Sequence, residues 1–289
     1  MVNKNEKMNC AMVILNYNDS HRAWKLAQKC KTFKNIDKII IVDNKSTDDS
    51  IEYFSKKSKD NKIEIVISKE NNGFASGNNI GARYILKKYS PTFLFFANTD
   101  TIFQEADLDA CFEKLKEDEK LALVSMRMLD VKGNEEKSSW KFIPFYKWIL
   151  LNFWIYRKFN FNKLIYQKFD TDFQYVDVVR GSFMVFKTEL FFKCGLFDEN
   201  TFLYFEEDII SYKLKEINYN VGLLTNHFYI HNHIYSKNKN KTYNEYYMDQ
   251  SLKYFLTNYY EIGILKTTLL ELCIFLGKIE SFFFNKLKQ

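Results

Sequence analysis

The chain is poor in the residues that break or cross-link structure. Its 289 residues include only two prolines and nine glycines, so no segment is typical of a flexible linker. The five cysteines are far apart and form no CxxC pair, which argues against a zinc site and favours buried, reduced thiols. No run of 18 uncharged apolar residues exists, so we predict no membrane-spanning helix.

The amino-terminal segment also lacks the features of a secretory signal. The residues before Cys10 are mostly polar and charged, and the apolar run that follows is short, without a small-residue cleavage site. We therefore expect a cytoplasmic protein. The net charge of +6 is mild. It fits an anionic substrate or an anionic membrane surface, and it is too weak to predict a nucleic-acid partner.

The first part of the chain alternates between short apolar runs and helical patterns. This alternation predicts an α/β fold with a mostly parallel sheet flanked by helices. The expected strands are 10–15, 38–42, 62–67, 93–97 and 121–126, and the expected helices are 21–33, a segment beginning at Thr47 or Asp48, 75–88 and 105–119.

The pattern changes after residue 126. An aromatic and basic stretch covers 140–169, and the tail 243–289 is helical in pattern and rich in Leu, Ile and Phe. Strands are expected at 173–179, 183–187 and 220–224, with a helix at 206–217. We predict a main domain over 1–236, made of a nucleotide-binding half (1–125) and an acceptor and catalytic half (126–236), followed by a C-terminal helical region (237–289).

Three apolar strands end in polar tips. These tips are Asn16-Tyr17-Asn18, Asp43-Asn-Lys-Ser-Thr-Asp48 and Asn98-Thr99-Asp100. In open α/β sheets ligands bind at the carboxyl ends of the strands, so the tips predict one shared pocket. Their acids and amides suit a nucleotide and a divalent metal, with Asp100 the carboxylate best placed to hold Mg²⁺ or Mn²⁺. Each tip is also explained by an ordinary turn with a helix cap.

A fourth motif is rich in amides and glycine. Asn71-Asn72-Gly73-Phe-Ala-Ser-Gly-Asn78-Asn79 could place backbone N–H groups near a diphosphate. It has neither the spacing of a Rossmann fingerprint nor that of a Walker loop. A turn followed by a helix start is the alternative interpretation.

Two further groups carry candidate chemistry. Glu206, Glu207 and Asp208 are adjacent acids flanked by apolar residues, which suits a general base and equally suits the acidic first turn of a helix. His231 and His233 point to opposite faces of an extended chain, so one imidazole at most faces a pocket. A structural role for either histidine is the alternative.

Taken in order, these motifs resemble the GT-A glycosyltransferases of family 2, in the subgroup of bacterial rhamnosyltransferase-like polysaccharide enzymes. The resemblance runs from about Asn9 to Ser236. The family's patterns V-D-N-x-S-x-D, N-x-G-F-A-x-G-N-N and F-D-E-x-F-x-x-Y-x-E-D are matched by Val42–Asp48, Asn71–Asn79 and Phe197–Asp208. Its DxD-type metal motif matches Asn98-Thr99-Asp100, without the first carboxylate, and its G-S step matches Gly181-Ser182.

The resemblance implies roles for individual residues. Asp43 contacts the nucleotide base, and Asp100 holds the metal with a histidine, His231 as first choice and His233 as second. The base that activates the acceptor is the second acid of the E-D pair, which the three acids leave open between Glu207 and Asp208. The donor site as a whole is assigned to Asn16, Tyr17, Asp43, Asn72, Gly73, Asn78, Asn98 and Gly181.

The predicted activity is an inverting, metal-dependent transfer of a sugar from a UDP- or dTDP-sugar to a hydroxyl of a glycan or lipid-linked acceptor, in cell-surface polysaccharide biosynthesis. The apolar, Lys-bearing segment 264–289 and the stretch 140–169 suggest peripheral contact with the inner face of a membrane. Packing on the main domain, or on a second copy in a homodimer, explains both equally. A sugar-1-phosphate nucleotidyltransferase and a non-catalytic sugar-nucleotide or glycan-binding protein are the alternative classes.

Overall fold

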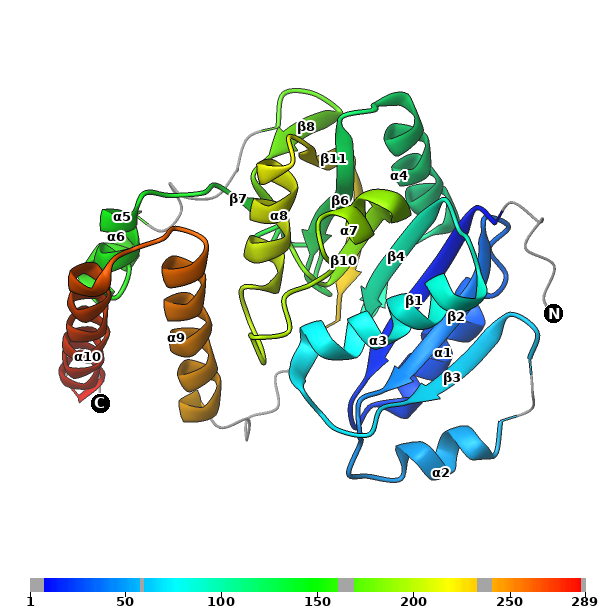
Figure 1. Cartoon of the computed structure of the whole chain (residues 1–289), viewed down its shortest axis with the longest axis horizontal. Helices are drawn as coiled ribbons and strands as arrows, with labels where there is room; N and C mark the ends of the chain where they lie inside the picture. The colour runs from blue at the N-terminus through cyan, green and yellow to red at the C-terminus, as the bar shows by residue number, and fades with distance from the viewer. Residues whose placement is uncertain (1–7, 58–59, 161–168, 233–240, 287–289) are drawn as a thin grey trace.

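The computed structural model describes residues 8–57, 60–160, 169–232 and 241–286. A mixed sheet forms the centre of the molecule, with strand order β3-β2-β1-β4-β10-β6-β11-β5 and β8 paired to β11 (Figure 1). The strands are β1 Cys10–Asn16, β2 Ile36–Asp43, β3 Ile63–Ile67, β4 Phe93–Asn98, β5 Thr101–Ile102, β6 Leu121–Leu129, β8 Phe173–Val176, β10 Phe183–Lys187 and β11 Asn220–His231. A small separate pair joins β7 (Ser139–Trp140) to β9 (Val178–Val179).

Four of the eight strand pairs in this sheet run parallel, and the α/β architecture confirms the predicted fold class. The strands β3, β2, β1 and β4 pair in parallel, and so do β6 and β11. The strand β10 lies antiparallel between β4 and β6. It therefore joins the two predicted halves, 1–125 and 126–236, into one sheet; that division stays a prediction.

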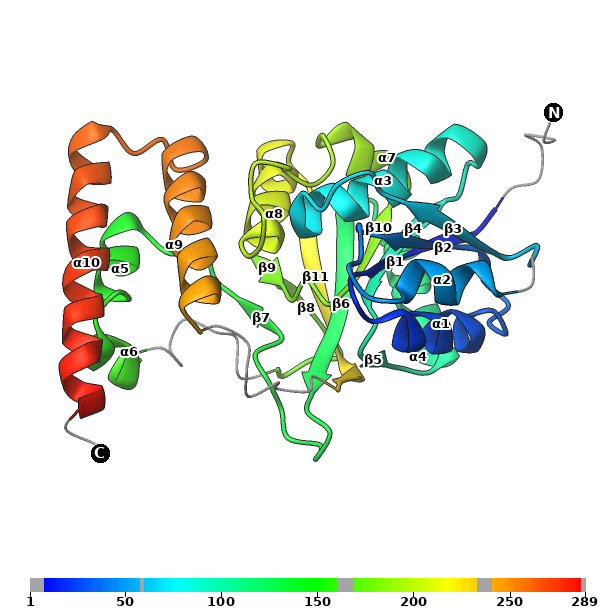
Figure 2. The ribbon, with the colours of Figure 1, turned by 90° about the horizontal axis from the view of Figure 1, so that it is seen from below.

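Helices cover both faces of the sheet (Figure 2). One face carries α1, α2 and α4, and the other carries α3, α7 and α8. Burial of strand residues on both faces explains why the strands are almost continuously apolar. The helices are α1 Ser20–Cys30, α2 Ser50–Ser55, α3 Gly73–Lys88, α4 Glu105–Glu117, α7 Thr188–Lys193 and α8 Glu206–Glu216.

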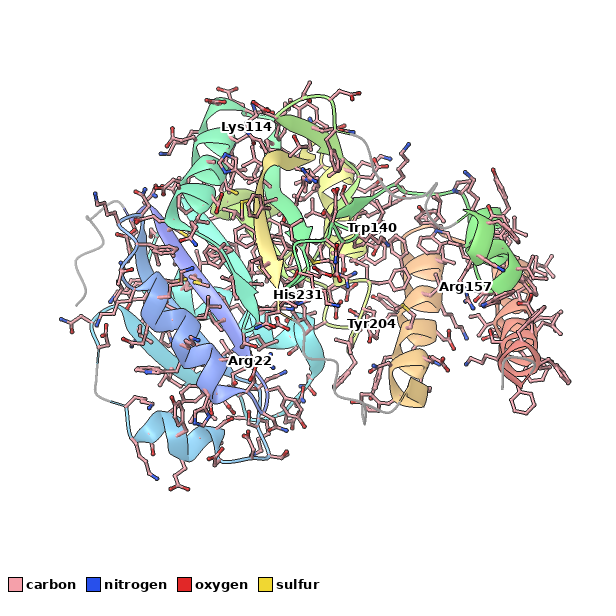
Figure 3. All side chains as sticks on the ribbon, turned by 180° about the vertical axis from the view of Figure 1, so that it is seen from behind. Arg22, Lys114, Trp140, Arg157, Tyr204 and His231 are labelled. Atoms are coloured by element: carbon pink, nitrogen blue, oxygen red, sulfur yellow. The ribbon has the colours of Figure 1, made fainter. Side chains whose placement is uncertain are left out.

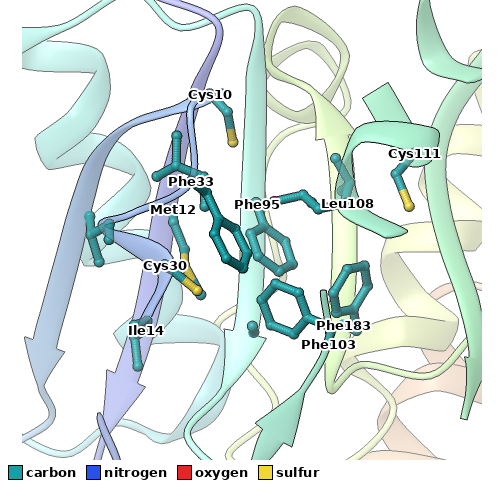
Figure 4. Packing of buried hydrophobic residues seen from close by; sticks show 14 of the residues in the cluster. Cys10, Met12, Ile14, Cys30, Phe33, Phe95, Phe103, Leu108, Cys111 and Phe183 are labelled. Atoms are coloured by element: carbon teal, nitrogen blue, oxygen red, sulfur yellow. The ribbon is translucent and has the colours of Figure 1, made fainter. Parts of the chain in front are cut away.

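The core on the α1 and α4 face is aromatic. Phe95, Phe103 and Phe183 pack in edge and tilted contacts with ring centroids 4.6–5.4 Å apart (Figure 4). Sulfur atoms fill the space around them, from Met12 and from three of the cysteines. All five cysteines are buried and free, as predicted.

The C-terminal part forms a helical appendage beside the sheet (Figures 1 and 2). Four helices build it: α5 Phe145–Leu150, α6 Trp154–Asn160, α9 Lys241–Asn258 and α10 Ile264–Lys286. Of these, α5, α9 and α10 pack into an apolar cluster with Phe205 and with Ile209 of α8. No helix in the described ranges is long and apolar enough to cross a membrane.

The structure differs from the predicted elements in several places. The predicted strand 173–179 is divided into β8 and β9, and α7 was not predicted. The strand predicted at 220–224 continues to His231 through an irregularity between Leu224 and Phe228. The helical tail is interrupted between Asn258 and Ile264, where Glu261 has a φ of 50°.

Candidate functional site

The predicted polar tips lie side by side at one edge of the sheet. Asn16 pairs with Asp43 across β1 and β2, and Leu15 pairs with Asn98 across β1 and β4. The parallel pairing thus brings together three tips that are far apart in the sequence. This edge is the carboxyl end of the strands, where open α/β sheets bind ligands.

Asp43 and Asn16 form a fully buried pair. The amide of Asn16 donates to Oδ2 of Asp43 at 2.8 Å, and the backbone N–H of Ser46 donates to Oδ1 at 2.9 Å. In this conformation Asp43 has no exposed surface, so it orders the loop after β2. Tyr17 is 47% exposed and offers the accessible aromatic face of this tip.

The amide-rich motif holds the loop that precedes α8. Gly73, with φ of +92°, packs so closely that an added Cβ would lie 2.0 Å from the carbonyl oxygen of Phe202. The N–H of Phe74 donates to that same oxygen at 2.9 Å. Asn79 is fully buried and donates to the carbonyl of Phe197 at 2.9 Å.

The other amides of this motif have separate partners. Asn78 is buried and donates to the carbonyl of Phe74 in its own helix, whereas Asn72 is exposed. Asn44, from the loop after β2, donates to Oδ1 of Asn71 at 2.9 Å. The motif therefore connects the nucleotide-side loops with the loop 197–205.

Asp100 and His231 meet at the end of the sheet. Nε2 of His231 lies 3.1 Å from Oδ1 of Asp100, and both side chains are about nine-tenths buried. Pairing of Thr101 in β5 with His231 in β11 sets this approach, and the N–H of Asn232 donates to the carbonyl of Asp100. Of the two predicted histidine ligands, His231 thus reaches Asp100, and His233 lies outside the described residues.

The donor set of this pair fits a divalent cation. One carboxylate and one imidazole leave coordination positions for diphosphate oxygens and water, as Mg²⁺ and Mn²⁺ sites often do. Within the described residues, no group of three or more His, Cys, Asp or Glu could hold a metal.

The three acids begin helix α8 directly after a strained turn. Tyr204 and Phe205 both have left-handed backbone conformations, with φ of 76° and 68°. Such strain in non-glycine residues persists only where the surroundings hold it, and it concentrates at functional sites. Here α9 supplies one support, since Oγ of Ser251 donates to the carbonyl of Leu203 at 2.9 Å.

The acids occupy different environments. Glu206 is buried, and burial followed by the charge of Glu207 raises its pKa well above the usual value. Asp208 is also buried and accepts a hydrogen bond from Nε1 of Trp140 at 2.8 Å. Burial, then the charge of Glu207, raises the pKa of Asp208 to about 7. Glu207 is half-buried, and its Oε2 lies 3.5 Å from where a Cβ of Gly181 would be.

The step Gly181-Ser182 connects the two chemical centres. The carbonyl of Ser182 accepts from the N–H of Asn98 at 3.0 Å, on the side of Asp100. Its hydroxyl lies 2.8 Å from that of Tyr229, two positions before His231.

Two basic residues near the acids were missed by the sequence analysis. The charges of Asp208 and Glu207 act on Lys137, whose pKa burial lowers to about 8. The charge of Arg180 in turn lowers the pKa of Asp208. Arg180 immediately precedes the Gly181-Ser182 step, so its place in the sequence pointed to the site. No motif around Lys137 and Trp140 indicated that these two residues lie near the acids.

Comparison with known proteins identifies the family. The model of glycosyl transferase family 2 matches residues 12–191, and the chain belongs to that family. A curated relative, the low-salt glycan biosynthesis hexosyltransferase Agl10 of Haloferax volcanii, is 21% identical over 248 residues, which are 86% of this chain and 75% of Agl10.

Solved structures share the fold at low identity. The mannosyltransferase PcManGT from Pyrobaculum calidifontis, in complex with GDP-Man and Mn²⁺, has a TM-score of 0.58 at 13% identity, over 96% of this chain and 72% of that one. S. aureus TarS 1-349 with UDP-GlcNAc has a TM-score of 0.54 at 11% identity, over 92% and 79%.

A third structure, GalNAc-T7 with UDP, GalNAc and Mn²⁺, has a TM-score of 0.56 at 14% identity, over 79% of this chain. The match spans 44% of the GalNAc-T7 chain, less than half its length. These likenesses show the fold. The family match defines the chain as a glycosyltransferase.

Proposed function

We propose that this protein is an inverting glycosyltransferase that moves a sugar from a UDP- or dTDP-sugar to a hydroxyl of a glycan or lipid-linked acceptor in cell-surface polysaccharide biosynthesis. One observation carries the proposal: Gly181 adjoins Glu207, and Ser182 contacts Asn98 and Tyr229, which stand two positions before Asp100 and His231. A site that can hold a leaving diphosphate and a site that can accept a proton are thereby neighbours, as displacement at an anomeric carbon requires.

The donor side rests on the strand ends. The Asn16 and Asp43 pair fixes the loop after β2, and exposed Tyr17 offers a ring for the base. Asp100 and His231 would hold Mg²⁺ or Mn²⁺, which when bound offsets the charge of the leaving diphosphate. The exclusion of water around both side chains strengthens their interaction with charge.

We assign the base to Glu207. Glu206 has no exposed path and is favoured in its protonated form, and Asp208 is occupied by the indole N–H of Trp140. Glu207 is the acid of the three that faces the Gly181 step. Its carboxylate accepts the proton of the acceptor hydroxyl as that oxygen attacks, while Asp208 and Trp140 fix the first turn of α8.

The test is a transfer assay with a defined product. Nucleotide release is followed by mass spectrometry with UDP- and dTDP-hexoses, Mn²⁺ and a panel of acceptors, and the anomeric configuration of the product is read by NMR. Inverted configuration is expected. Retention of configuration would rule out a single displacement assisted by Glu207.

We also propose that the protein contacts an anionic membrane through α10. The outward face of this helix is apolar, and Ile264 and Leu265 are each 87% exposed. Both acids of α10 face protein partners: Glu271 pairs with Lys253, and Glu280 accepts from the backbone N–H of Trp154 at 2.5 Å. An apolar face free of acids, with lysines nearby, suits an anionic lipid surface.

The apolar residues of this face follow helical spacing. They recur every three or four positions, so they form one stripe along the helix. They are Leu265, Leu269, Leu272, Phe275, Leu276, Ile279, Phe282 and Phe283.

A further inference from the structure

A cavity lies between the helical appendage and the loop that carries the acids. Its volume is about 470 Å³, which is within the range of small-ligand sites. Eleven of the twelve lining residues belong to the helical appendage, and Tyr204, from the turn before α8, completes the wall on the side of the catalytic domain. Its lining includes Tyr204, Arg157, Asn244, Asp249, Lys278 and Phe282.

The lining combines hydrogen-bonding groups with two aromatic rings. Asn244 supplies a donor and an acceptor. Asp249 and Lys278 form an ion pair of 2.5 Å, and Nη2 of Arg157 donates to Ser281 at 3.4 Å. Such groups match the ring hydroxyls of a sugar, and the faces of Tyr204 and Phe282 can pack against its C–H groups.

Tyr204 links this cavity to the acids. It stands two residues before Glu206, and burial followed by the charge of Glu206 raises its pKa. The turn around it is fixed from α9, where Tyr247 stacks on Phe202 with ring centroids 4.5 Å apart. Figure 3 shows Tyr204 between His231 and the appendage that carries Arg157. A ligand in the cavity would thus lie beside the turn that positions Glu207.

We propose that this cavity is an acceptor subsite that binds a hexose unit of the acceptor glycan. The proposal rests on the proposed function and adds where the acceptor lies and what recognises it. The donor occupies the edge near Asp100, and the acceptor approaches from the side of the appendage. The C-terminal helices therefore contribute directly to acceptor specificity.

The test blocks the cavity and leaves the donor site intact. In Asn244→Trp a bulky ring from α9 fills the cavity, and Gln250→Trp places the same ring on an exposed position of α9 that does not line it. Both full-length variants and the wild type are compared by saturation-transfer NMR. The probes are the p-nitrophenyl glycosides of glucose, galactose, mannose and N-acetylglucosamine, in the presence of UDP and Mn²⁺.

The expected result is contact with at least one glycoside in the wild type and in Gln250→Trp, and a dissociation constant raised about tenfold or more in Asn244→Trp. Equal affinity in all three proteins, or no contact with any glycoside, would overturn the subsite. Binding of the nucleotide to each protein, measured separately by thermal shift, distinguishes this failure from a failure of the proposed function. If nucleotide binding is retained and Asn244→Trp does not change glycoside affinity, the acceptor subsite is rejected and the proposed function is not.

Discussion

Nε2 of His231 lies 3.1 Å from Oδ1 of Asp100, although 131 positions separate the two residues in the chain. The sheet creates this contact, because the far end of β11 pairs with the short strand that follows Asp100. Both groups are buried and both are ligands that a divalent cation accepts. Substitution of His231 therefore tests whether donor binding depends on a metal ion.

We predict that His231→Ala weakens Mn²⁺ binding in the presence of UDP by about 10- to 100-fold or more, since even the loss of outer-shell partners costs that much. His227→Ala is the matched control, because His227 lies on the same strand and contacts Asp107 at 2.9 Å. Electron paramagnetic resonance titration measures free Mn²⁺. Equal Mn²⁺ affinity in the two variants would remove His231 from the metal site.

We predict that Glu207→Gln lowers the transfer rate on the order of 10²- to 10⁴-fold, the usual contribution of a general base. Nucleotide binding should be unchanged, since the change is isosteric and Glu207 is assigned to the acceptor and not to the donor. Asp208→Asn is compared in parallel and should retain more activity. In the wild type Asp208 accepts a hydrogen bond from Trp140, and the amide oxygen of Asn can accept the same bond. A larger loss in Asp208→Asn than in Glu207→Gln would move the base to Asp208.

Stability should depend on pH through Asp208. Burial and the charge of Glu207 raise its pKa from 3.8 to about 7 in the folded state. Between these two pKa values the folded protein holds a proton that the unfolded chain releases, so this contribution to stability is complete below the unfolded pKa and lost as pH rises through the folded pKa. Between pH 5 and 8 the melting temperature should fall less steeply with rising pH for Asp208→Asn than for the wild type. The same pH dependence of the melting temperature in both proteins would contradict the raised pKa of Asp208.

The energetic cost of crowding between residue 73 and Phe202 can be measured separately from the cost of a positive φ. Gly73 and Gly133 both have positive φ, but a Cβ at Gly73 meets the Phe202 carbonyl at 2.0 Å and one at Gly133 meets nothing within 4 Å. We expect Gly133→Ala to cost roughly 1 kcal/mol of unfolding free energy. Gly73→Ala should cost about 1–3 kcal/mol more, as overpacking does. Urea denaturation of both variants measures the difference, and equal costs would show that the loop 197–205 is not held there.

Membrane contact should depend on the apolar face of α10. Leu272→Glu with Leu276→Glu is expected to reduce co-sedimentation with phosphatidylglycerol vesicles and to have no effect with uncharged phosphatidylcholine vesicles, which bind weakly in both cases. Leu86→Glu, at an exposed position of α3, is the control for an added acid. Unchanged sedimentation of the double variant would count against a lipid surface, and a loss of dimers instead would indicate a second copy as the partner.

Much of the sheet could be predicted from the sequence because its strands are short apolar runs that end in polar residues. Asn16, Asp43 and Asn98 meet at one edge simply because parallel strands end together. The continuation of β11 to His231 was not predictable from the pattern. Thr225-Asn226-His227 interrupts the apolar run, and the pairing shifts register there.

The tertiary contacts of the three acids could also not be predicted from the sequence. Trp140 reaches Asp208 across 68 positions, and hydrogen bonds of this kind follow from packing alone. The amide-rich motif had been interpreted as a diphosphate cradle, whereas in the structure its Gly73 and Asn79 hold the loop 197–205. Its role toward the diphosphate stays a prediction for Asn72, Gly73 and Asn78.

The most direct test of the central claim is a thermal-shift screen of UDP-, dTDP- and GDP-sugars, each with and without Mn²⁺ or Mg²⁺. A ligand that binds only the folded state raises the melting temperature by an amount that grows with the logarithm of its concentration over its dissociation constant. We predict a rise with a UDP- or dTDP-sugar that requires the metal. No rise with any nucleotide sugar, or the same rise without metal, would contradict a donor site built on Asp100 and His231.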